Sequence, residues 1–527
     1  MQAPLNGIPG RRWCMYASVL LILYGCLLAS KSIAGFPTSH TTHTRWPWLG
    51  DKPVGEDGFY MLTVADNLAR TGHLVYNYNL PATGIQPLAT FVFAGIAYCT
   101  DHLGGDRWTL VRWVLLFGVL LFVVFAWQIA YIAADLAPPD LKSLVFPIAF
   151  FLTLFDYTAF RLFTYGLETG IYLVSIAICM KLWLRLTEAP KASWLDALLF
   201  GVAAGIGGLA RIDFGIFVAF LLGYLLLKRI ATLPQVLAAG CVALAIVSPW
   251  FLFVHKVTGS WLPTSGKAES RLYSHDFVRI PPAIMALLAS ICPWSYADAE
   301  SRSTTILACL SACLVLFLIW RARKSPSPFS AFRRLGIFKA WLPPLVAIVL
   351  IYVIFFFSKW FYTRYFSPLL IVSIPFLAIL FVTQRFVRER PQALLLAIAF
   401  LFCLFDIPSM HSGHVVLDHL MAAGYIHDNY PVERVGAFQS GAIGYFNPNV
   451  ENLDGKLNQR ALAAAAPDRM GPFIDSERID VLVDWPGFLI GHLPDDYRNR
   501  EWQTCPQPLP VSDSMCLIRK HPFAPTP

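Results

Sequence analysis

Charged residues are scarce in this chain of 527 residues: only 14% are Asp, Glu, Lys or Arg, whereas 56% are hydrophobic. The mean hydropathy of +0.56 lies far from the balance of a soluble globular protein, so a soluble enzyme is excluded. The net charge is +8, but the basic residues fall in short runs between apolar segments and form no single basic face. A nucleic-acid partner is therefore not expected.

The sequence also lacks any CxxC pair or Cys/His cluster with metal-ligand spacing, so a structural zinc site is not expected. Most of the 11 Cys lie in apolar stretches, where thiols pack as small hydrophobic groups. Cys505 and Cys516 differ, because they lie in a polar C-terminal segment. They form either a disulfide or two free thiols, and an oxidising compartment would favour the disulfide slightly.

The chain contains many long apolar runs. We expect the first run, after Arg11 and Arg12, to be a retained helix and not a cleaved signal peptide, because many further spans follow it. Eleven runs predict membrane spans, at about 15–34, 108–134, 143–163, 170–186, 194–210, 214–227, 234–254, 304–320, 338–357, 365–384 and 392–406. The stretches 86–99 and 281–296 are shorter or flanked by Pro, and they predict interfacial or re-entrant helices.

The distribution of Lys and Arg orients these spans, since cytoplasmic turns carry the excess of positive charge. With the N-terminus in the cytoplasm, the cytoplasmic turns hold Lys142, Lys181, Arg185, Lys191, Lys228, Arg229, Arg321, Arg323, Lys324, Arg333, Arg334, Lys339, Arg385, Arg388 and Arg390. The loops 35–107 and 255–303 and the tail 407–527 then lie outside. The sequence thus predicts an α-helical polytopic membrane protein with about eleven spans in 1–406, followed by a small extracytoplasmic α/β domain in 407–527 with strands near Arg434–Phe438 and Ile479–Asp484.

The first exported loop contains two adjacent acids, Glu56 and Asp57, before a helix-like segment that includes Tyr60. The two acids are either a helix N-terminus with a favourable dipole interaction or a site at which one carboxylate accepts a proton from a substrate hydroxyl. We assign Asp57 as the general base and Glu56 as a secondary or substrate-orienting acid. Gln86, in Gly84-Ile85-Gln86-Pro87-Leu88, and Tyr60 are candidates for contacts with the acceptor or the donor sugar.

Two further exported turns carry ionisable groups next to apolar helices. Glu168, in Tyr165-Gly166-Leu167-Glu168-Thr169, is either a cap of the next helix or part of the catalytic site. Arg211 and Asp213 occur two residues apart in a very short turn, and for Asp213 we favour an internal ion pair. Such groups are costly at membrane depth and usually face a cavity, so together these turns indicate a site.

Cations on the exported side break the general charge trend and have two explanations. They either anchor helices to lipid headgroups or bind an anion such as a lipid phosphate. The candidates are Lys267, near Arg271, in Pro263-Thr264-Ser265-Gly266-Lys267, together with Lys359 and Arg364 in Lys359-Trp360-Phe361-Tyr362-Thr363-Arg364-Tyr365. With Arg211, at least two of these four cations are expected to converge beside Asp57, and the hydroxyls of Tyr362 and Tyr365 to assist Arg364.

The order and common sidedness of these motifs resemble the GT-C superfamily of integral-membrane glycosyltransferases. In the tail, Val435-Gly436-Ala437-Phe438, Gly441-Ala442-Ile443-Gly444-Tyr445 and Asn452-Leu453-Asp454-Gly455-Lys456-Leu457-Asn458 are similar to a bacterial branch with arabinofuranosyl- and mannosyl-type transferases. The resemblance implies a donor with one sugar on a polyprenyl phosphate, an acidic base in the first exported loop and inversion at the anomeric carbon. Relatives often carry two aspartates where this chain has Glu56 and Asp57.

These observations predict an inverting glycosyltransferase of a bacterial inner membrane that modifies a glycan, lipid or protein acceptor on the extracytoplasmic side. Its partners would be the lipid-linked sugar, that acceptor and membrane lipid; no organic cofactor is predicted, and a divalent cation is one option. A transporter or flippase of a lipid-linked substrate is the alternative, although transport sites lie near the bilayer midplane and often between internal repeats, and no repeat is found. A non-catalytic subunit that has lost its base is a third option, which Asp57 opposes.

Overall fold

The computed structural model of the protein describes residues 14–22, 36, 54–77, 80–188, 192–271, 280–292, 302–323, 338–356, 362–401, 414–507, 509–510 and 514–523. The described helices of the membrane part, besides the helical residues 14–22, are α3 (Glu56–Thr71), α4 (Pro87–His102), α5 (Arg107–Leu136), α6 (Lys142–Leu154), α7 (Tyr157–Thr164), α8 (Thr169–Glu188), α9 (Trp194–Ala210), α10 (Phe214–Leu227), α11 (Leu233–Thr258), α12 (Thr264–Arg271), α13 (Ile280–Ile291), α14 (Arg302–Arg323), α16 (Phe338–Phe355), α17 (Tyr362–Phe366), η5 (Ser367–Leu369), α18 (Leu370–Thr383), α19 (Arg385–Glu389) and α20 (Pro391–Leu401).

Within the described residues, five segments are long and apolar enough to cross a membrane, or six if the bent pair α6 and α7 is one span. They are α5, α8, α11, α16 and the continuous segment Tyr362–Thr383. Several other expected spans are helical but shorter: α10, for example, has 14 residues, which at about 1.5 Å per residue falls short of a hydrocarbon core of about 30 Å. The expected span 304–320 lies within α14, which has 22 residues. Most of the expected first span, 15–34, lies outside the described residues.

The expected span 143–163 is broken in the structure. The Asp156 side chain accepts a hydrogen bond from the backbone N–H of Ala159 at 3.0 Å and so caps α7. The axes of α6 and α7 differ by 63° at this break. A short polar side chain that bonds the next turn starts a new helix, which is why one apolar run becomes two elements.

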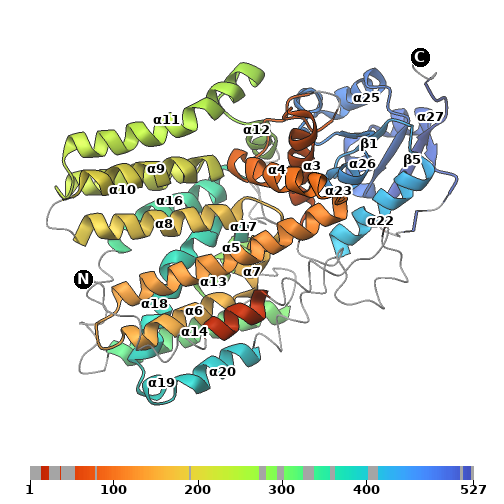
Figure 1. Cartoon of the computed structure of the whole chain (residues 1–527). Coiled ribbons are helices and arrows are strands. Elements are labelled where there is room, and N and C mark those ends of the chain that lie inside the picture. Colours follow the sequence, from red (N-terminus) through yellow and green to blue (C-terminus); the bar gives the residue numbers. More distant parts are fainter. Residues whose placement is uncertain are drawn as a thin grey trace.

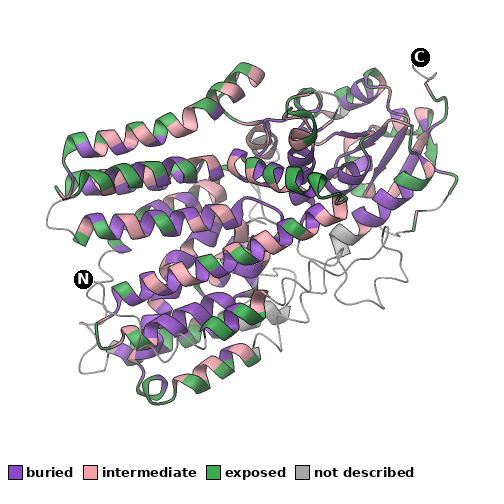
Figure 2. Cartoon of the chain, in the orientation of Figure 1, coloured by how far each residue is buried: buried purple, intermediate pink, exposed green. Residues whose placement is uncertain are grey.

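The long helices pack as a bundle in which α5 contacts α6, α8 and α18, and α9 lies between α8 and α11 (Figure 1). Large aromatic side chains, among them Trp183 and Trp341, fill its interior. The outer helix α11 is largely exposed along its length (Figure 2). Only 17% of its most apolar 18-residue stretch is buried. Exposed apolar helix faces of this kind are expected of a protein that contacts lipid.

The C-terminal part is an α/β domain, as the sequence predicts. It contains α22 (His414–Asn429), β1 (Val435–Ala437), α23 (Gly441–Phe446), β2 (Val450–Asn452), α24 (Gln459–Ala463), α25 (Pro467–Ser476), β3 (Val481–Asp484), α26 (Pro486–His492), α27 (Asp495–Glu501), β4 (Trp502–Thr504) and β5 (Met515–Arg519). The two strands expected from the sequence are β1 and β3. The sheet order is β2-β1-β3-β5-β4, parallel among the first three and antiparallel beyond. Cys505 and Cys516 form the disulfide between the ends of β4 and β5.

The α/β domain lies at one end of the helical bundle, against α3 and the beginning of α5 (Figure 1). The side chain of Tyr445 donates to the backbone carbonyl of Arg107 at 2.8 Å, which ties α23 to α5. The turns expected in the cytoplasm, such as those beside Lys142 and Lys228, lie at the far end of the bundle. The order of the eleven expected spans and the side of the membrane on which each end lies stay predictions.

Candidate active site

Helix α3 begins directly after Gly55, and its position depends on two glycines, Gly55 and Gly58. A Cβ on Gly58 would lie 2.3 Å from the backbone carbonyl oxygen of Tyr165, and one on Gly55 would lie 2.1 Å from the Tyr165 ring. The backbone N–H of Gly55 donates to Tyr165 O at 3.0 Å. Because no side chain intervenes, the first turn of α3 lies directly on the turn that precedes α8. Glu56 and Asp57 occupy that first turn, where the helix dipole favours negative charge.

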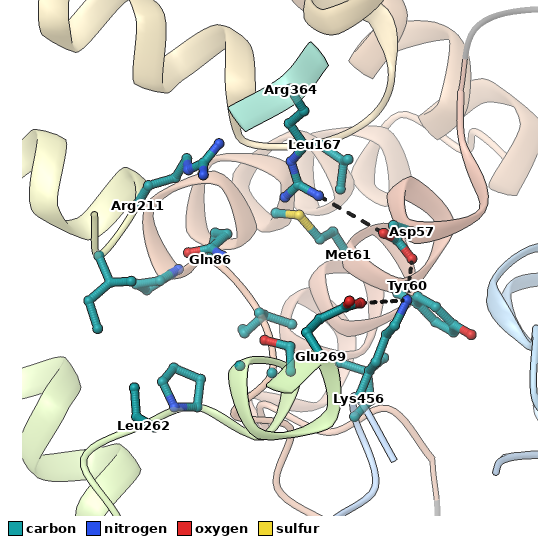
Figure 3. Close-up of a pocket in the computed structure, with 18 of the residues that line it drawn as sticks. Asp57, Tyr60, Met61, Gln86, Leu167, Arg211, Leu262, Glu269, Arg364 and Lys456 are labelled. Atoms are coloured by element: carbon teal, nitrogen blue, oxygen red, sulfur yellow. Dashed lines mark hydrogen bonds and ion pairs between the residues drawn. The ribbon is translucent and has the colours of Figure 1, made fainter. Parts of the chain in front are cut away.

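The Asp57 carboxylate has a cation near each of its oxygens. Arg364 Nη1, from α17, lies 3.9 Å from Asp57 Oδ2. Lys456 Nζ, from the turn after β2, lies 3.3 Å from Asp57 Oδ1. Figure 3 shows both contacts at one side of the same cavity. Asp57 is therefore charge-compensated and still faces the space that a substrate would enter.

Arg364 is positioned by Glu168 at the start of α8. Arg364 Nη2 donates to both carboxylate oxygens of Glu168 at 2.7 Å, and Glu168 is completely buried. Arg211 Nε lies 3.8 Å from the same carboxylate. A buried carboxylate between two guanidinium groups holds them close together despite their repulsion. Two of the four cations expected to converge therefore meet at one residue.

Arg211 sits in the turn between α9 and α10 and is buried with Asp213. Arg211 Nη2 donates to Asp213 Oδ2 at 2.7 Å, which confirms the internal ion pair expected for this aspartate. The guanidinium also lies 4.8 Å from the ring centroid of Tyr172 and 4.9 Å from that of Tyr365. Tyr365 is stacked on Tyr352, with ring centroids 3.8 Å apart. Aromatic faces stabilise a cation without neutralising it, so Arg211 keeps its charge at the cavity wall.

The α/β domain supplies the other wall. Burial alone would lower the pKa of Lys456, but Asp57 and Glu269 outweigh it and raise the pKa above its ordinary value, so this side chain is a cation. Lys456 Nζ lies 3.4 Å from Glu269 Oε1 of α12. The neighbouring Asp454 accepts from the Tyr60 hydroxyl at 3.2 Å. Burial raises the pKa of Asp454 to about 6, against the opposing charge of Lys456.

These groups surround a cavity of about 180 Å³. Its polar lining comes from four helices (α3, α12, α16 and α17), the residue before α4, the turn after α9 and the α/β domain. Its apolar lining includes Trp250 and Phe251 of α11 and Leu262 after it, together with Met61 and Leu167 on the opposite side (Figure 3). The charged and hydrogen-bonding residues at the wall are Asp57, Tyr60, Gln86, Arg211, Ser265, Glu269, Tyr352, Arg364, Tyr365 and Lys456. A cavity with one acid beside several cations can accept a proton at one point and hold an anion at another.

Glu56 faces away from this cavity, although it is adjacent to Asp57. Its carboxylate accepts from the backbone N–H of Ala442 at 3.1 and 3.2 Å and lies 3.1 Å from His419 Nδ1. Successive residues of a helix point about 100° apart, so only one of two adjacent acids can face the cavity. The structure thus places Glu56 in the contact between α3 and the α/β domain, and not at the position expected for a substrate-orienting acid.

Some of the remaining predicted residues line the cavity, and others lie outside its wall. Gln86, Tyr60 and Tyr365 line the cavity, whereas Glu168 lies behind Arg364. Tyr362 is buried among Ala283, Ala286 and Phe366, outside the cavity wall. Lys267 is on α12, where its neighbours Ser265, Gly266 and Glu269 form the wall instead. Lys359 lies outside the described residues.

Sequence reasoning did not assign Lys456 or Glu269 to the site. Lys456 follows Asp454 and Gly455 in a segment rich in polar residues, and Glu269 lies in the polar helix α12. In the part of the chain that the structure covers, no group of three or more His, Cys, Asp or Glu side chains comes together as a metal site. We therefore assign no metal ligand.

Solved structures with a similar fold are known. A scan against models of known families finds no match, and a search of curated proteins finds none. Among solved structures, ArnT from Cupriavidus metallidurans bound to undecaprenyl phosphate matches with a TM-score of 0.52 and 14% identity, over 95% of this chain and 97% of that one. The same protein in the apo state gives a TM-score of 0.50 at 13% identity, with the same coverage.

An oligosaccharyltransferase from Archaeoglobus fulgidus, in the apo form, matches with a TM-score of 0.50 and 11% identity, over 91% of this chain and 70% of that one. At these identities the matches concern the fold, which extends over nearly the whole chain and includes both of its parts. The chain thus has the fold of ArnT and of this oligosaccharyltransferase, and its described residues include five helices that are long and apolar enough to cross a membrane.

Proposed function

We propose that the protein is an inverting glycosyltransferase that moves a single sugar from a polyprenyl-phosphate donor to an acceptor hydroxyl. The observation that carries the proposal is the position of Asp57 in a cavity whose wall also holds Arg211, Arg364 and Lys456. A phosphate is already a good leaving group, so such an enzyme needs cations to stabilise the departing charge and a base to activate the acceptor. This wall provides both.

In the proposed reaction, Asp57 takes the proton of the acceptor hydroxyl while the hydroxyl oxygen attacks the anomeric carbon. The bond from that carbon to the phosphate oxygen breaks, and the phosphate leaves with the electron pair. Arg364, fixed by Glu168, and Arg211, fixed by Asp213, supply positive charge on the leaving-group side. Because attack and departure occur on opposite faces of the anomeric carbon, a single displacement inverts its configuration.

The single sugar of the proposed donor follows from the sequence resemblance. The phosphate and the sugar would lie in the cavity beside Asp57 and the three cations. The polyprenyl chain would leave through the apolar wall, where Trp250, Phe251 and Leu262 lie. We propose a bacterial inner membrane as the location, with the α/β domain and this cavity on the extracytoplasmic face and an acceptor that is a glycan, lipid or protein.

The donor panel that tests the proposal contains pentosyl and hexosyl polyprenyl phosphates, including the arabinofuranosyl and mannosyl types that the sequence resemblance favours. Purified protein in detergent is incubated with each donor and with a mixture of glycan, lipid and peptide acceptors, and release of polyprenyl phosphate is measured. At least one donor should be consumed by the wild-type protein and spared by Asp57→Asn. Consumption of none, together with transport of one of them across a liposome membrane, would favour the transporter alternative. Asp57, Arg211 and Arg364 lie at or beside the ends of helical segments and not midway along the long helices, which supports the transferase.

A further inference from the structure

Lys456 belongs to the α/β domain, yet its side chain ends in the cavity formed with the membrane helices (Figure 3). The turn after β2 can direct it there because Gly455 adopts a φ of +80°. A Cβ at Gly455 would lie 2.6 Å from the Cα of Leu462, so the turn is closed tightly against α24. The sequence therefore builds a turn whose next residue projects away from the domain.

The backbone of this turn is held from two sides. Asp454 accepts from the backbone N–H of Lys456 at 2.7 Å and, through its other oxygen, from the Tyr60 hydroxyl of α3. The carbonyl oxygen of Lys456 accepts from the Thr264 hydroxyl of α12 at 2.6 Å. Two membrane-side elements thus fix the main chain of Lys456, and its flexible side chain is left to respond to what occupies the cavity.

The three cations of the wall are held unequally. Arg211 and Arg364 each make a contact of 2.7 Å to a buried carboxylate, Asp213 and Glu168 respectively. Lys456 Nζ lies at 3.3 Å from Asp57 and 3.4 Å from Glu269, and all three side chains are slightly exposed to the cavity. Longer contacts to better solvated carboxylates are weaker. Lysine, with four rotatable methylene groups and a single point of charge, also changes partner more easily than arginine.

We propose, resting on the transferase function above, that Lys456 exchanges partners when the donor binds: its ammonium group leaves Asp57 and Glu269 and binds the donor phosphate. Asp57 Oδ1 is then free to accept the proton of the acceptor hydroxyl. Glu269 is the carboxylate that holds Lys456 at rest. The α/β domain thereby contributes a residue that binds substrate, and binding of the donor prepares the base.

The exchange predicts opposite effects of removing the two partners of one ion pair. Undecaprenyl phosphate, which carries no sugar and so cannot react, is titrated into purified protein in detergent. Lys456→Met should weaken its binding about tenfold to a hundredfold, the effect of losing one charged hydrogen bond. Glu269→Gln should tighten binding several-fold, because Lys456 no longer has to leave this carboxylate. Lys256→Met, at an exposed position near the end of α11, is the matched control and should bind as the wild type does.

Inorganic phosphate as a competitor separates the headgroup from the lipid chain. Its inhibition constant should rise in Lys456→Met, and an unchanged constant would overturn the assignment. So would wild-type affinity for undecaprenyl phosphate in Lys456→Met. Equal weakening by Glu269→Gln and Lys456→Met would show that the pair only joins the domains. Failure of the wild type to bind undecaprenyl phosphate at all would reject the proposed function itself, before any variant is compared. Thermal unfolding midpoints establish that each variant is folded.

Discussion

A single guanidinium nitrogen of Arg364, Nη2, donates to both carboxylate oxygens of Glu168 at 2.7 Å. This pair links α17 to the residue that precedes α8. Glu168 has no exposure to solvent, so its charge depends on the arginines beside it. The pair fixes where the positive charge of the cavity is placed. Its removal should therefore change both the stability of the fold and the affinity for an anion.

Glu168→Gln is expected to lower the free energy of unfolding by about 3 kcal/mol, because Arg364 then keeps only the more distant Asp57, at 3.9 Å, as a counter-charge. Unfolding in mixed detergent, followed by circular dichroism, measures this. Glu389→Gln is the matched control, since Glu389 forms an exposed pair with Arg385 and should contribute little. If the double variant Glu168→Gln/Arg364→Met were no more stable than Glu168→Gln alone, the unpaired charge would not be the cause.

Asp57→Asn is expected to reduce turnover by roughly 100-fold or more, since the amide keeps the shape of the side chain and cannot accept the proton. Release of polyprenyl phosphate from the preferred donor gives the rate. Asp101→Asn, at an exposed aspartate near the end of α4, serves as the control. Near-wild-type turnover of folded Asp57→Asn would mean that the acid only supports the helix start, and loss in Glu56→Gln instead would exchange the two roles.

The contact between Glu56 and His419 predicts that stability falls as pH rises. Burial opposes protonation of His419, but Glu56 outweighs it and, with Asp484 and Asp418 nearby, raises the pKa above its ordinary 6.5. A raised pKa means that the folded state binds the proton more tightly, so this contribution is complete below pH 6.5 and is lost as pH rises through the folded-state pKa. Burial raises the pKa of Asp484 to about 6, although the nearby His419 opposes this shift. The contribution of Asp484 to the stability of the folded state therefore declines as the pH rises from about 3.8 to about 6.

Thermal unfolding midpoints measured from pH 4 to pH 9 test this dependence. The wild-type midpoint should fall across both windows, and His419→Gln should remove the decline above pH 6.5 while keeping the lower one. A wild-type midpoint that rose between pH 6.5 and pH 9 would contradict the assignment. The stacking of His419 on Trp485, with centroids 4.7 Å apart, is retained in form by His419→Phe, which separates packing from charge.

The sidedness of the chain is tested by fusions. A reporter that is fluorescent only in the cytoplasm should stay dark when fused after the α/β domain, because Lys and Arg gather in the turns at the opposite end of the bundle. The same reporter fused after the turn that precedes Lys142 should be bright. Fluorescence from the C-terminal fusion would place the cavity on the cytoplasmic face and remove the basis for an extracytoplasmic acceptor.

Much of the cavity could be read from the sequence, because its residues contrast with their surroundings. Asp57, Arg211 and Arg364 each stand at the edge of an apolar helix, where a charge is costly unless a cavity or a partner accommodates it. Gln86 and Tyr60 could be predicted because they lie in the same expected exported loop as Asp57. The α/β domain could likewise be predicted, since alternating apolar residues return where the long runs end.

Lys456 and Glu269 could not be found in this way, since both lie in segments where charged residues are ordinary. Their approach to Asp57 depends on the tertiary contacts that the α/β domain makes with both α3 and α12, which no local pattern encodes. Glu56 shows a related limit of sequence reasoning: the pair of acids is visible in sequence, but which one faces the cavity depends on the rotation of α3. That rotation is set by contacts of Gly58 with Tyr165 and of Glu56 with Ala442.

The absence of a side chain at Gly441 has a consequence for anyone who would re-engineer this protein. A Cβ there would lie 2.1 Å from the backbone oxygen of Glu56, and one at Gly444 would lie 2.0 Å from the Tyr76 hydroxyl. At Gly441 the α/β domain and α3 therefore meet backbone to backbone, and at Gly444 the Tyr76 hydroxyl lies directly on the backbone of α23. A chimera that exchanges the α/β domain with that of a relative must therefore also exchange α3 and the loop that follows it. A chain truncated before the α/β domain would lack the cavity wall that Lys456 and Leu457 form.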